Sequence, residues 1–575
     1  MRRFFAVLMV PLAAFVLTAG PGAHGVGAQF DPPTSFDVME VTIPQLQTAM
    51  ATGAVTSKQL VKLYLERIAA YEPTLNAFIT VNPRVVAEAE QRDLERARGQ
   101  IRGSLHGIPI ALKDNVLTTD LTTTGGALAL AHLRPPYEAT LVTRLRGAGA
   151  VIIGKTVMTE LANWVSDAMP GNYSAVGRYG YNPWDPRQDP RPGTDARGFP
   201  FADGRPALAT GGSSSGIATS ANLAAANIGT ETSGSILSPS NQNMLVGIKP
   251  TVGLISRHGV IPITADQDTA GPMTRDVASA AIMLNVLAGP DPNDPPAFMG
   301  PPSCPTVDYT HSLDPHGLVG AHIGIAEPYY ATSNAATRAV IDQAEAAMMA
   351  AGAFVMHVNV PSFAALQAFG ICAAREQTRA NDANCSVVLK FGFKRDFNAF
   401  LASLGSRAPV STLTEMREFN LAHIADNSIK YLQARLDISD EMDVARDYTR
   451  YVTDRSKDLQ LAATTGIDAA LATPPGYDAL LFAGARGADI AARPGYPSVT
   501  VPFGFIPNAP TPPFPPGFNA KDAPLGMTFA ATACSEPTLV RLAYGFEQAT
   551  HKRFAPPLFP AIDTRSQGGA RRNHP

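Results

Sequence analysis

The 575-residue sequence contains only four cysteines, and no two of them form a Cys-x-x-Cys pair. Metal sites built on thiolates usually have paired cysteines at short spacing, so we do not expect such a site. In an oxidising compartment four cysteines could form one or two disulfides. We expect Cys372 to pair with Cys385, because only a short loop needs closing. Cys304 and Cys534 are either a second pair or free buried thiols.

The chain also lacks a large excess of charge of either sign, because 46 Lys and Arg residues and 49 Asp and Glu residues leave a net charge of −3. A nearly neutral chain has no global field that favours nucleic acid or an acidic membrane surface. Basic residues do not cluster beyond short pairs at the two ends. We therefore expect no nucleic acid partner.

Long apolar runs are absent except at the start of the chain. Two arginines follow Met1, an apolar run covers residues 4–17, and Val26-Gly-Ala28 offers a small-residue cleavage site. This pattern predicts an export signal over residues 1–28. The run is shorter than the roughly 20 residues of a spanning helix, although an uncleaved anchor is the alternative. Residues 29–575 are expected to form a protein that is secreted or periplasmic, without a stable membrane anchor.

Short apolar runs alternate with helical patterns through much of the sequence. Residues 106–115 and 150–154 are typical of buried strands, and residues 141–149 between them are typical of a helix. Such alternation predicts an α/β fold in which helices cover a sheet. No internal repeat is evident. Residue patterns typical of buried strands occur towards both ends of the sequence, which favours one domain over residues 29–575. A mostly helical peripheral region is expected at about 290–461, and residues 182–206 should form an exposed loop.

Lys113 is the first candidate for chemistry, because it ends an apolar run. Burial disfavours the charged form of lysine and lowers its pKa, which allows a lysine to act as a general base near neutral pH. The alternative is a lysine at a strand end that reaches solvent or pairs with Asp114.

The second candidate is the segment Gly211-Gly-Ser-Ser-Ser-Gly216, which precedes a helix of small residues. Its central serine, Ser214, matches the Gly-x-Ser-x-Gly elbow of α/β-hydrolases, which would make the protein an esterase. A flexible linker is a further alternative. A phosphate-binding loop would need Gly-Lys-Ser or Gly-Lys-Thr, which is absent.

The third candidate is Gly229-Thr-Glu-Thr-Ser-Gly-Ser235. A glycine directly before a serine in a tight polar loop can aim several backbone N–H groups at one point, as an oxyanion hole requires. Thr232, Ser233 and Gly234 are the residues expected to line that hole. The alternative is an ordinary turn.

Together, and in this order, the three segments resemble the amidase signature family. The resemblance runs from about Thr42 to Pro557 and includes Gly247-Ile-Lys-Pro-Thr251, Gln267-Asp-Thr-Ala-Gly-Pro-Met273 and Pro494-Gly-Tyr-Pro-Ser-Val-Thr-Val-Pro502. Gly-Thr-Glu-Thr, together with Ser220-Ala-Asn-Leu-Ala, looks most like the bacterial peptide amidase branch, whose members release ammonia from C-terminal peptide amides.

The resemblance implies a large twisted mixed sheet flanked by α-helices, and a Ser-Ser-Lys triad that needs no cofactor or metal. Lys113 would be the base, Ser235 the acylated nucleophile, and Ser213 the bridging serine after a cis peptide bond. Ser213 and Ser235 lie about two residues closer together than the family pattern has them, which leaves Ser214 as the alternative bridge.

The sequence thus predicts a secreted amidase that hydrolyses linear amides of small molecules or peptides through an acyl-enzyme. Two alternatives remain at this point. One is an amidase-fold protein that binds ligands without catalysis, and the other is the esterase built on Ser214.

Overall fold

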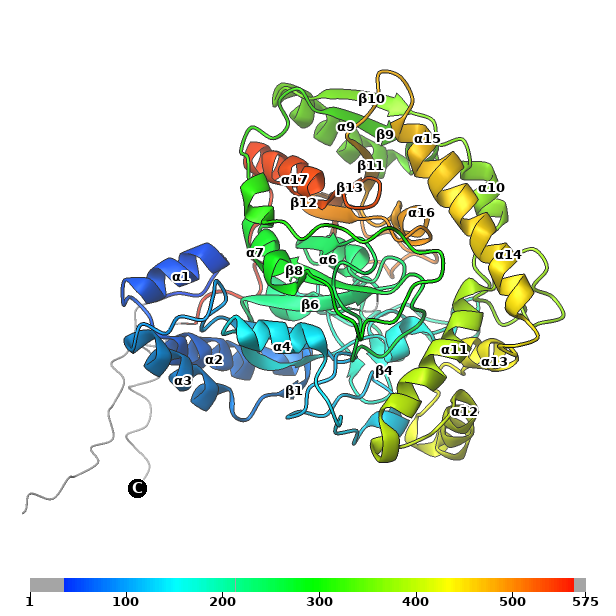
Figure 1. Cartoon of the computed structure of the whole chain (residues 1–575), viewed down its shortest axis with the longest axis horizontal. Helices are drawn as coiled ribbons and strands as arrows, with labels where there is room; N and C mark the ends of the chain where they lie inside the picture. Colours follow the sequence, from blue (N-terminus) through cyan, green and yellow to red (C-terminus); the bar gives the residue numbers. More distant parts are fainter. Residues whose placement is uncertain (1–35, 213, 563–575) are drawn as a thin grey trace, which may run out of the picture. The chain divides into compact units, whose positions relative to one another are not determined.

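Eleven strands form one mixed sheet in the computed structural model, which describes residues 36–212 and 214–562 (Figure 1). The strand order is β1-β3-β2-β6-β8-β7-β12-β13-β11-β9-β10. The strands are β1 (Phe78–Val81), β2 (Pro109–Lys113), β3 (Val151–Thr156), β6 (Ala226–Glu231), β7 (Val246–Lys249), β8 (Thr269–Thr274), β9 (His322–Ala326), β10 (Phe354–Val358), β11 (Ala479–Ala483), β12 (Ser498–Ile506) and β13 (Ala523–Ala530). Two short strands, β4 (Tyr173–Ser174) and β5 (Arg178–Tyr179), form a separate pair. The predicted α/β architecture is confirmed.

Helices flank the sheet, and the helical patterns identified in the sequence fold as expected (Figure 1). They are α1 (Ile43–Ala51), α2 (Ser57–Leu75), α3 (Val85–Ala97), α4 (Thr140–Gly147), α5 (Ile217–Ser220), α6 (Leu237–Gln242), α7 (Val277–Leu287), α8 (Glu327–Ala331), α9 (Ala335–Ala350), α10 (Phe363–Ala368), α11 (Val388–Ser403), α12 (Leu413–Ala422), α13 (Ala434–Asp440), α14 (Tyr448–Leu459), α15 (Asp468–Leu471), α16 (Ala488–Ala492) and α17 (Glu536–Thr550). Thr56 is the N-cap residue of α2. Its side chain accepts the Gln59 N–H at 3.1 Å, and the Gln59 amide oxygen accepts the Thr56 N–H in return.

The direction of three central strands brings distant segments to one edge of the sheet. Strand β2 runs parallel to β6, so the ends of both strands lie at the same edge. Strand β8 runs antiparallel to β6, with Glu231 paired to Thr269, so the start of β8 lies there too. Lys113, the loop after Glu231 and Asp268 therefore meet at this edge, although they are far apart in the sequence.

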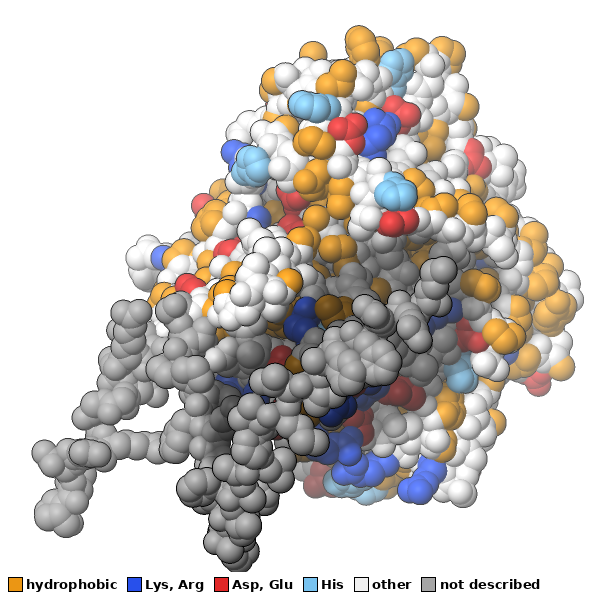
Figure 2. Space-filling model, turned by 60° about the vertical axis from the view of Figure 1, so that its left-hand side comes forward, with side chains coloured by type: hydrophobic (Ala, Val, Ile, Leu, Met, Phe, Trp, Pro, Cys, Tyr) orange, Lys and Arg blue, Asp and Glu red, His pale blue; other side chains and the backbone are white. Residues whose placement is uncertain are grey.

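Residues 290–461, which were expected to form a mostly helical peripheral region, also form part of the main sheet. About half of residues 290–461 is helical, and the region also contributes β9 and β10, which complete one side of the main sheet. No helix within residues 36–212 and 214–562 is long and apolar enough to cross a lipid bilayer. On the face shown in Figure 2, outside the grey atoms, acidic, basic and hydrophobic side chains are interspersed.

The loop at residues 182–206 is less exposed than its composition predicts. A short pattern, Asp-x-Arg, occurs four times in it, and in each case the Asp side chain accepts the backbone N–H of the Arg two residues later. Three of these pairs also form ion pairs, and the Asp residues of those three are nearly buried. The Asp side chains bind both backbone N–H groups and Arg charges, which buries the two ends of the loop. The expectation of an exposed loop holds for its middle, since most of residues 190–200 are exposed.

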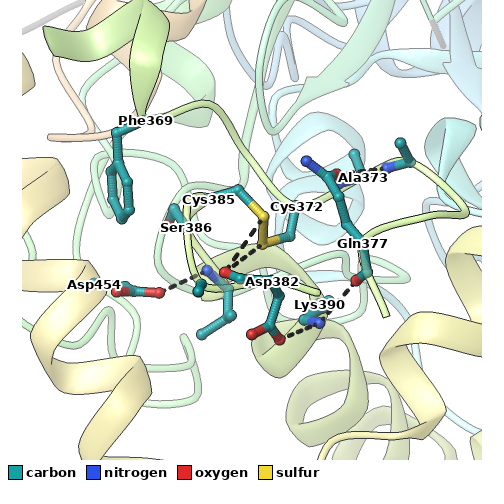
Figure 3. Close-up of a disulfide and its surroundings, with 12 residues drawn as sticks. Phe369, Cys372, Ala373, Gln377, Asp382, Cys385, Ser386, Lys390 and Asp454 are labelled. Atoms are coloured by element: carbon teal, nitrogen blue, oxygen red, sulfur yellow. Dashed lines mark hydrogen bonds and ion pairs between the residues drawn. A yellow bond between two sulfur atoms is a disulfide. The ribbon is translucent and has the colours of Figure 1, made fainter. Parts of the chain in front are cut away.

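Both pairs of cysteines form disulfides. Cys372 is bonded to Cys385, which confirms the expected pair, and Cys304 is bonded to Cys534. Figure 3 shows that the first disulfide closes a loop whose Asp382 forms an ion pair with the buried Lys390 at 2.6 Å. The loop is therefore held by a covalent bond and by a buried charge pair.

Candidate active site

Lys113 is fully buried at the end of β2. Its Nζ donates to Thr230 Oγ1 at 2.8 Å and to the Thr230 carbonyl oxygen at 3.2 Å. Burial lowers the pKa of Lys113 to about 7, although the carboxyl groups of Asp268 and Glu231 oppose this change. Asp114 pairs instead with Lys155 at 3.0 Å, so the alternative of a Lys113–Asp114 ion pair or a solvent-exposed Lys113 is wrong.

The loop from Glu231 to Leu237 is held in shape from within by one buried carboxylate. Glu231 Oε1 accepts the Gly234 N–H at 2.7 Å. Its Oε2 accepts the N–H groups of Ile236 and Leu237 at 2.7 and 2.9 Å. Glu231 is 1% exposed, so these charge-assisted bonds form in a dry interior. No role for Glu231 was predicted from the sequence, although its position at the end of an apolar segment was a usable signal.

Ser235 lies at the turn between β6 and α6 and is 9% exposed. Within the described part of the chain, no residue accepts a hydrogen bond from the N–H of Ser233 or of Ser235. The role of these amides as oxyanion donors stays a prediction. The Gly234 N–H differs from the expectation for this loop, because it is already bound to Glu231. Gly234 has a φ of 84°, which a glycine adopts without strain.

The Gly211–Gly216 segment packs directly against the loop from Glu231 to Leu237. A Cβ atom at Gly212 would lie 3.1 Å from the Ser235 Cα, so this position leaves no room for a side chain. The Ser214 N–H donates to the Ser235 carbonyl at 3.3 Å. The predicted bridge, Ser213, and the cis bond expected before it lie outside the described residues.

Ser214 is fully buried, and its hydroxyl both donates a hydrogen bond to Thr230 and accepts one from it. Ser214 Oγ donates to the Thr230 carbonyl at 3.0 Å and accepts the Thr230 N–H at 3.2 Å. A nucleophile elbow requires an exposed hydroxyl at a sharp strand-to-helix turn. The esterase hypothesis built on Ser214 is therefore wrong.

Asp268 is a site residue that sequence reasoning missed. Its Oδ1 accepts the Thr232 hydroxyl, and its Oδ2 accepts the N–H groups of Ile263 and Thr264 at 2.8 and 3.0 Å. Burial raises the pKa of Asp268 to about 7, while the hydrogen bond from Thr232 acts in the opposite direction. The available signal was its place in the segment Gln267-Asp-Thr-Ala-Gly-Pro.

Two amide side chains complete the polar surroundings of Lys113. Asn115 Nδ2 donates to Thr230 Oγ1 at 3.0 Å, the same oxygen that accepts Lys113. Gln267 Nε2 donates to the Thr232 carbonyl at 3.3 Å. The hydroxyl oxygen of Thr230 thus accepts hydrogen bonds from both Lys113 and Asn115, which fixes the position of the Lys113 amine relative to β6.

Lys249 is a second buried lysine, and its hydrogen bonds differ from those of Lys113. Burial lowers the pKa of Lys249 to about 8, but its Nζ donates to the backbone carbonyl of Tyr496 at 2.7 Å. It also donates to the carbonyl of Pro250 at 3.3 Å. Neither partner is a group that could relay a proton, so Lys249 ties the end of β7 to the segment that precedes β12. Within the described residues, no three His, Cys, Asp or Glu side chains are grouped to hold a metal ion.

A buried lysine and a serine loop that meet at one edge of a mixed sheet match what the predicted serine–lysine hydrolase requires. A model of the amidase family matches residues 59–193 and 202–540. The chain belongs to the amidase family and is an enzyme that hydrolyses amide bonds.

Known relatives agree with this assignment. The structure is similar to native peptide amidase from Stenotrophomonas maltophilia, with 37% sequence identity and a TM-score of 0.75 over 90% of this chain and 98% of that one. A peptide amidase in complex with the competitive inhibitor chymostatin matches equally well, over 90% of this chain and 99% of that one. An Arabidopsis thaliana protein named "Probable amidase" is 31% identical over 98% of this chain and 99% of its own length. The resemblance to the peptide amidase branch is confirmed.

Proposed function

We propose that the protein is a secreted peptide amidase, with Ser235 as nucleophile, Ser213 as proton bridge and Lys113 as base. The observation that carries this proposal is the burial of Lys113, whose amine lies against Thr230 in the strand that leads to Ser235. An amine with a pKa of about 7 is half neutral at the pH where the enzyme would work, and only the neutral amine can accept a proton.

The reaction then proceeds in two halves. In the first, the Ser235 hydroxyl loses its proton through Ser213 to Lys113, and its oxygen attacks the carbonyl carbon of the amide. The amides of Thr232, Ser233 and Ser235 stabilise the oxyanion, and each such donor contributes about 10²–10³-fold in kcat. The proton returns to the leaving nitrogen as the C–N bond breaks, and the acyl group stays on Ser235 as an ester.

In the second half, water replaces the amine as the reacting group. Lys113 accepts a proton from water through the same bridge, and the resulting hydroxide attacks the ester carbonyl. The bond between Ser235 and the acyl carbon breaks, and the serine oxygen takes up the proton. The products are a carboxylic acid and ammonia or an amine.

C-terminal peptide amides are the proposed substrates. Support comes from the 37% identity to peptide amidases across nearly all of their length, and from the peptide-like inhibitor bound by one of them. Small aliphatic amides and aryl acylamides are the other classes that a serine amidase could accept.

A panel of amides tests both the reaction and the substrate class. Ammonia or amine release is measured for a blocked dipeptide amide, the matching dipeptide acid, an aryl acylamide and a small aliphatic amide. Lys113→Met keeps the length of the side chain without the amine, and Ser235→Ala removes the nucleophile. Ser238→Ala, in the first turn of α6, is the matched control because its serine is only partly buried and close to the same loop.

The proposal expects the peptide amide to have the highest kcat/KM, with loss of about 10³-fold or more in both site variants. The control variant should remain within about twofold of the parent, since a surface substitution costs little. Equal activity of Lys113→Met and the parent would overturn the proposed mechanism. A higher kcat/KM for the aryl or aliphatic amide would overturn only the substrate class.

We also propose that residues 1–28 are removed during export, so that the mature chain begins at Gln29. These residues lie outside the described part of the chain. Two disulfides support an extracellular or periplasmic location, because such bonds persist in oxidising compartments. Expression in a bacterium, followed by fractionation and N-terminal sequencing, should recover a chain starting at Gln29 outside the cytoplasm. Recovery of the intact chain from the membrane fraction would favour an uncleaved anchor.

A further inference from the structure

A cavity of about 180 Å³ opens next to Asp268. Its walls are mainly apolar and include Tyr137, Val260, Pro262 and Phe400. Neither Lys113 nor Ser235 is among the described residues that line it. The cavity is therefore separate from the nucleophile, although it shares the carboxyl group of Asp268 with the catalytic centre.

The aromatic wall of this cavity is fixed in place. The ring of Tyr137 stacks on the ring of His258, with centroids 4.9 Å apart and planes 12° from parallel. The Tyr137 hydroxyl shares a hydrogen bond of 2.7 Å with Ser403 Oγ at the end of α11. The polar end of this tyrosine is satisfied, so its ring can form a preformed apolar surface.

The other charged side chains of the lining already have partners. Arg257 forms an ion pair with Asp294 at 2.7 Å, and Asp396 forms one with Arg395 at 2.6 Å. A ligand gains little from a charge here, because these groups are neutralised by the protein. The lining thus favours a neutral molecule with an apolar body.

We propose that this cavity is a second ligand site, which binds a small neutral aromatic molecule of about the size of indole. An apolar cavity of about 150 Å³ in another protein holds benzene, so the volume here suits one or two fused rings. The occupant is therefore a small molecule that is chemically distinct from the amide substrate.

Asp268 provides the connection between the two sites. Its carboxyl group is bound to Thr232 on the nucleophile loop, and the charged groups around it are Lys113, Arg257 and Asp396. A ligand in the cavity displaces water from this carboxyl and disfavours its charged form. Lys113 then loses the attraction of a nearby negative charge and gives up its proton at lower pH. Occupancy should therefore shift the acid side of the pH–rate profile to lower pH.

Two substitutions in α11 distinguish ligand binding in the cavity from other effects of a new aromatic ring on the helix. Ala399 lines the cavity and Ala402 does not, yet both are exposed positions in α11. Ala399→Phe should fill the cavity, while Ala402→Phe adds the same ring to the same helix outside it. Binding of indole is measured by titration calorimetry to the parent and both variants, and kcat/KM without indole shows that each variant is folded.

The parent and Ala402→Phe should bind indole with a Kd of about 1 mM or tighter. Ala399→Phe should bind at least about 10-fold more weakly, which is 1.4 kcal/mol. Parent enzyme whose Ser235 has been blocked by a fluorophosphonate should bind indole with the same Kd, because the sites are separate. Saturating indole should move the midpoint of the acid limb to lower pH by about 0.3 in the parent but not in Ala399→Phe.

Absence of binding to the parent, or equal binding to Ala399→Phe, would overturn the proposed site. Loss of indole binding after Ser235 is blocked would also overturn it, since the probe would then occupy the substrate pocket. Binding with no change in the pH–rate profile would overturn the connection through Asp268.

Discussion

The amine of Lys113 lies 2.8 Å from the hydroxyl oxygen of Thr230, in a part of the protein that solvent does not reach. Thr230 lies in the strand that ends directly before the nucleophile loop. The base and the nucleophile loop are therefore held by adjacent strands of one sheet, and this sets their relative position more tightly than a surface loop could.

Replacing the Thr230 hydroxyl should impair the base without unfolding the protein. Thr230→Val keeps the shape of the side chain but removes the oxygen that accepts both Lys113 and Asn115. We expect kcat to fall by about 10-fold or more, since an unpaired buried donor costs about 1–3 kcal/mol. Without this acceptor the protonated amine is less stable, so the acid limb of the pH–rate profile should also move to lower pH.

Thr219→Val is the matched control for that experiment. Thr219 is also fully buried, and its hydroxyl has no hydrogen-bond partner within the described residues. Its removal should leave kcat and the pH–rate profile unchanged. Equal kinetics of Thr230→Val and Thr219→Val would contradict a role for the Lys113–Thr230 contact.

Glu231→Gln tests whether the nucleophile loop depends on its buried carboxylate. Both carboxylate oxygens accept backbone N–H groups, so the NH₂ group of glutamine must face a donor on one side. We expect kcat to fall by about 10²-fold and fluorophosphonate labelling of Ser235 to slow by a similar factor. Circular dichroism should remain close to that of the parent. Unchanged labelling would show that the loop keeps its shape without this carboxylate.

The sequence predicted the strand and helix pattern well wherever the chain carries a periodic signal. Helix α4 and strands β2 and β3 all lie where apolar spacing placed them. Residues 226–231 and 269–274 were recognised only as parts of motifs, because Gly, Thr and Pro in these strands hide the alternation of a typical strand. Their pairing across the sheet is a long-range property that local spacing does not contain.

The candidate site was predicted in part. Lys113 and the Ser235 loop meet at one edge of the sheet, as the motifs required, but the roles of Glu231, Asp268 and Thr230 emerge only from contacts between strands. The occupation of the Gly234 N–H by Glu231 was likewise invisible, because it depends on the path of the loop and not on residue type. The roles of Ser213 and of the oxyanion amides stay predictions.

We expect the free energy of unfolding to depend on pH because of Glu547. Burial and the neighbouring carboxyl of Asp276 raise the pKa of Glu547 to about 8, although the Val277 N–H opposes this. A carboxyl with a raised pKa stabilises the fold below its unfolded pKa of about 4.5, and this stabilisation is lost as pH rises towards 8. Glu547→Gln should therefore change Tm little at pH 5 and raise it at pH 8. A larger rise at pH 5 than at pH 8 would contradict the assignment.

The two disulfides should stabilise the protein to different extents. Cys304 and Cys534 are 230 residues apart in the sequence, whereas Cys372 and Cys385 are 13 apart. Loop-closure entropy predicts that loss of the longer link lowers the free energy of unfolding by about 2–3 kcal/mol more. Double Cys→Ser variants of each pair can be compared by denaturant unfolding under identical conditions. A greater loss for the Cys372–Cys385 variant would show that native contacts in its loop outweigh chain entropy.

The pH dependence of Ser235 acylation is the most direct test of the central claim that a neutral Lys113 activates this serine. The rate of fluorophosphonate labelling is followed by mass spectrometry from pH 5 to pH 10 in the parent and in Lys113→Met. The parent should label at Ser235, at a rate that rises with pH to a plateau with its midpoint at about 7. Lys113→Met should label far more slowly, without that midpoint. A midpoint near 10, or equal labelling of both proteins, would contradict the account.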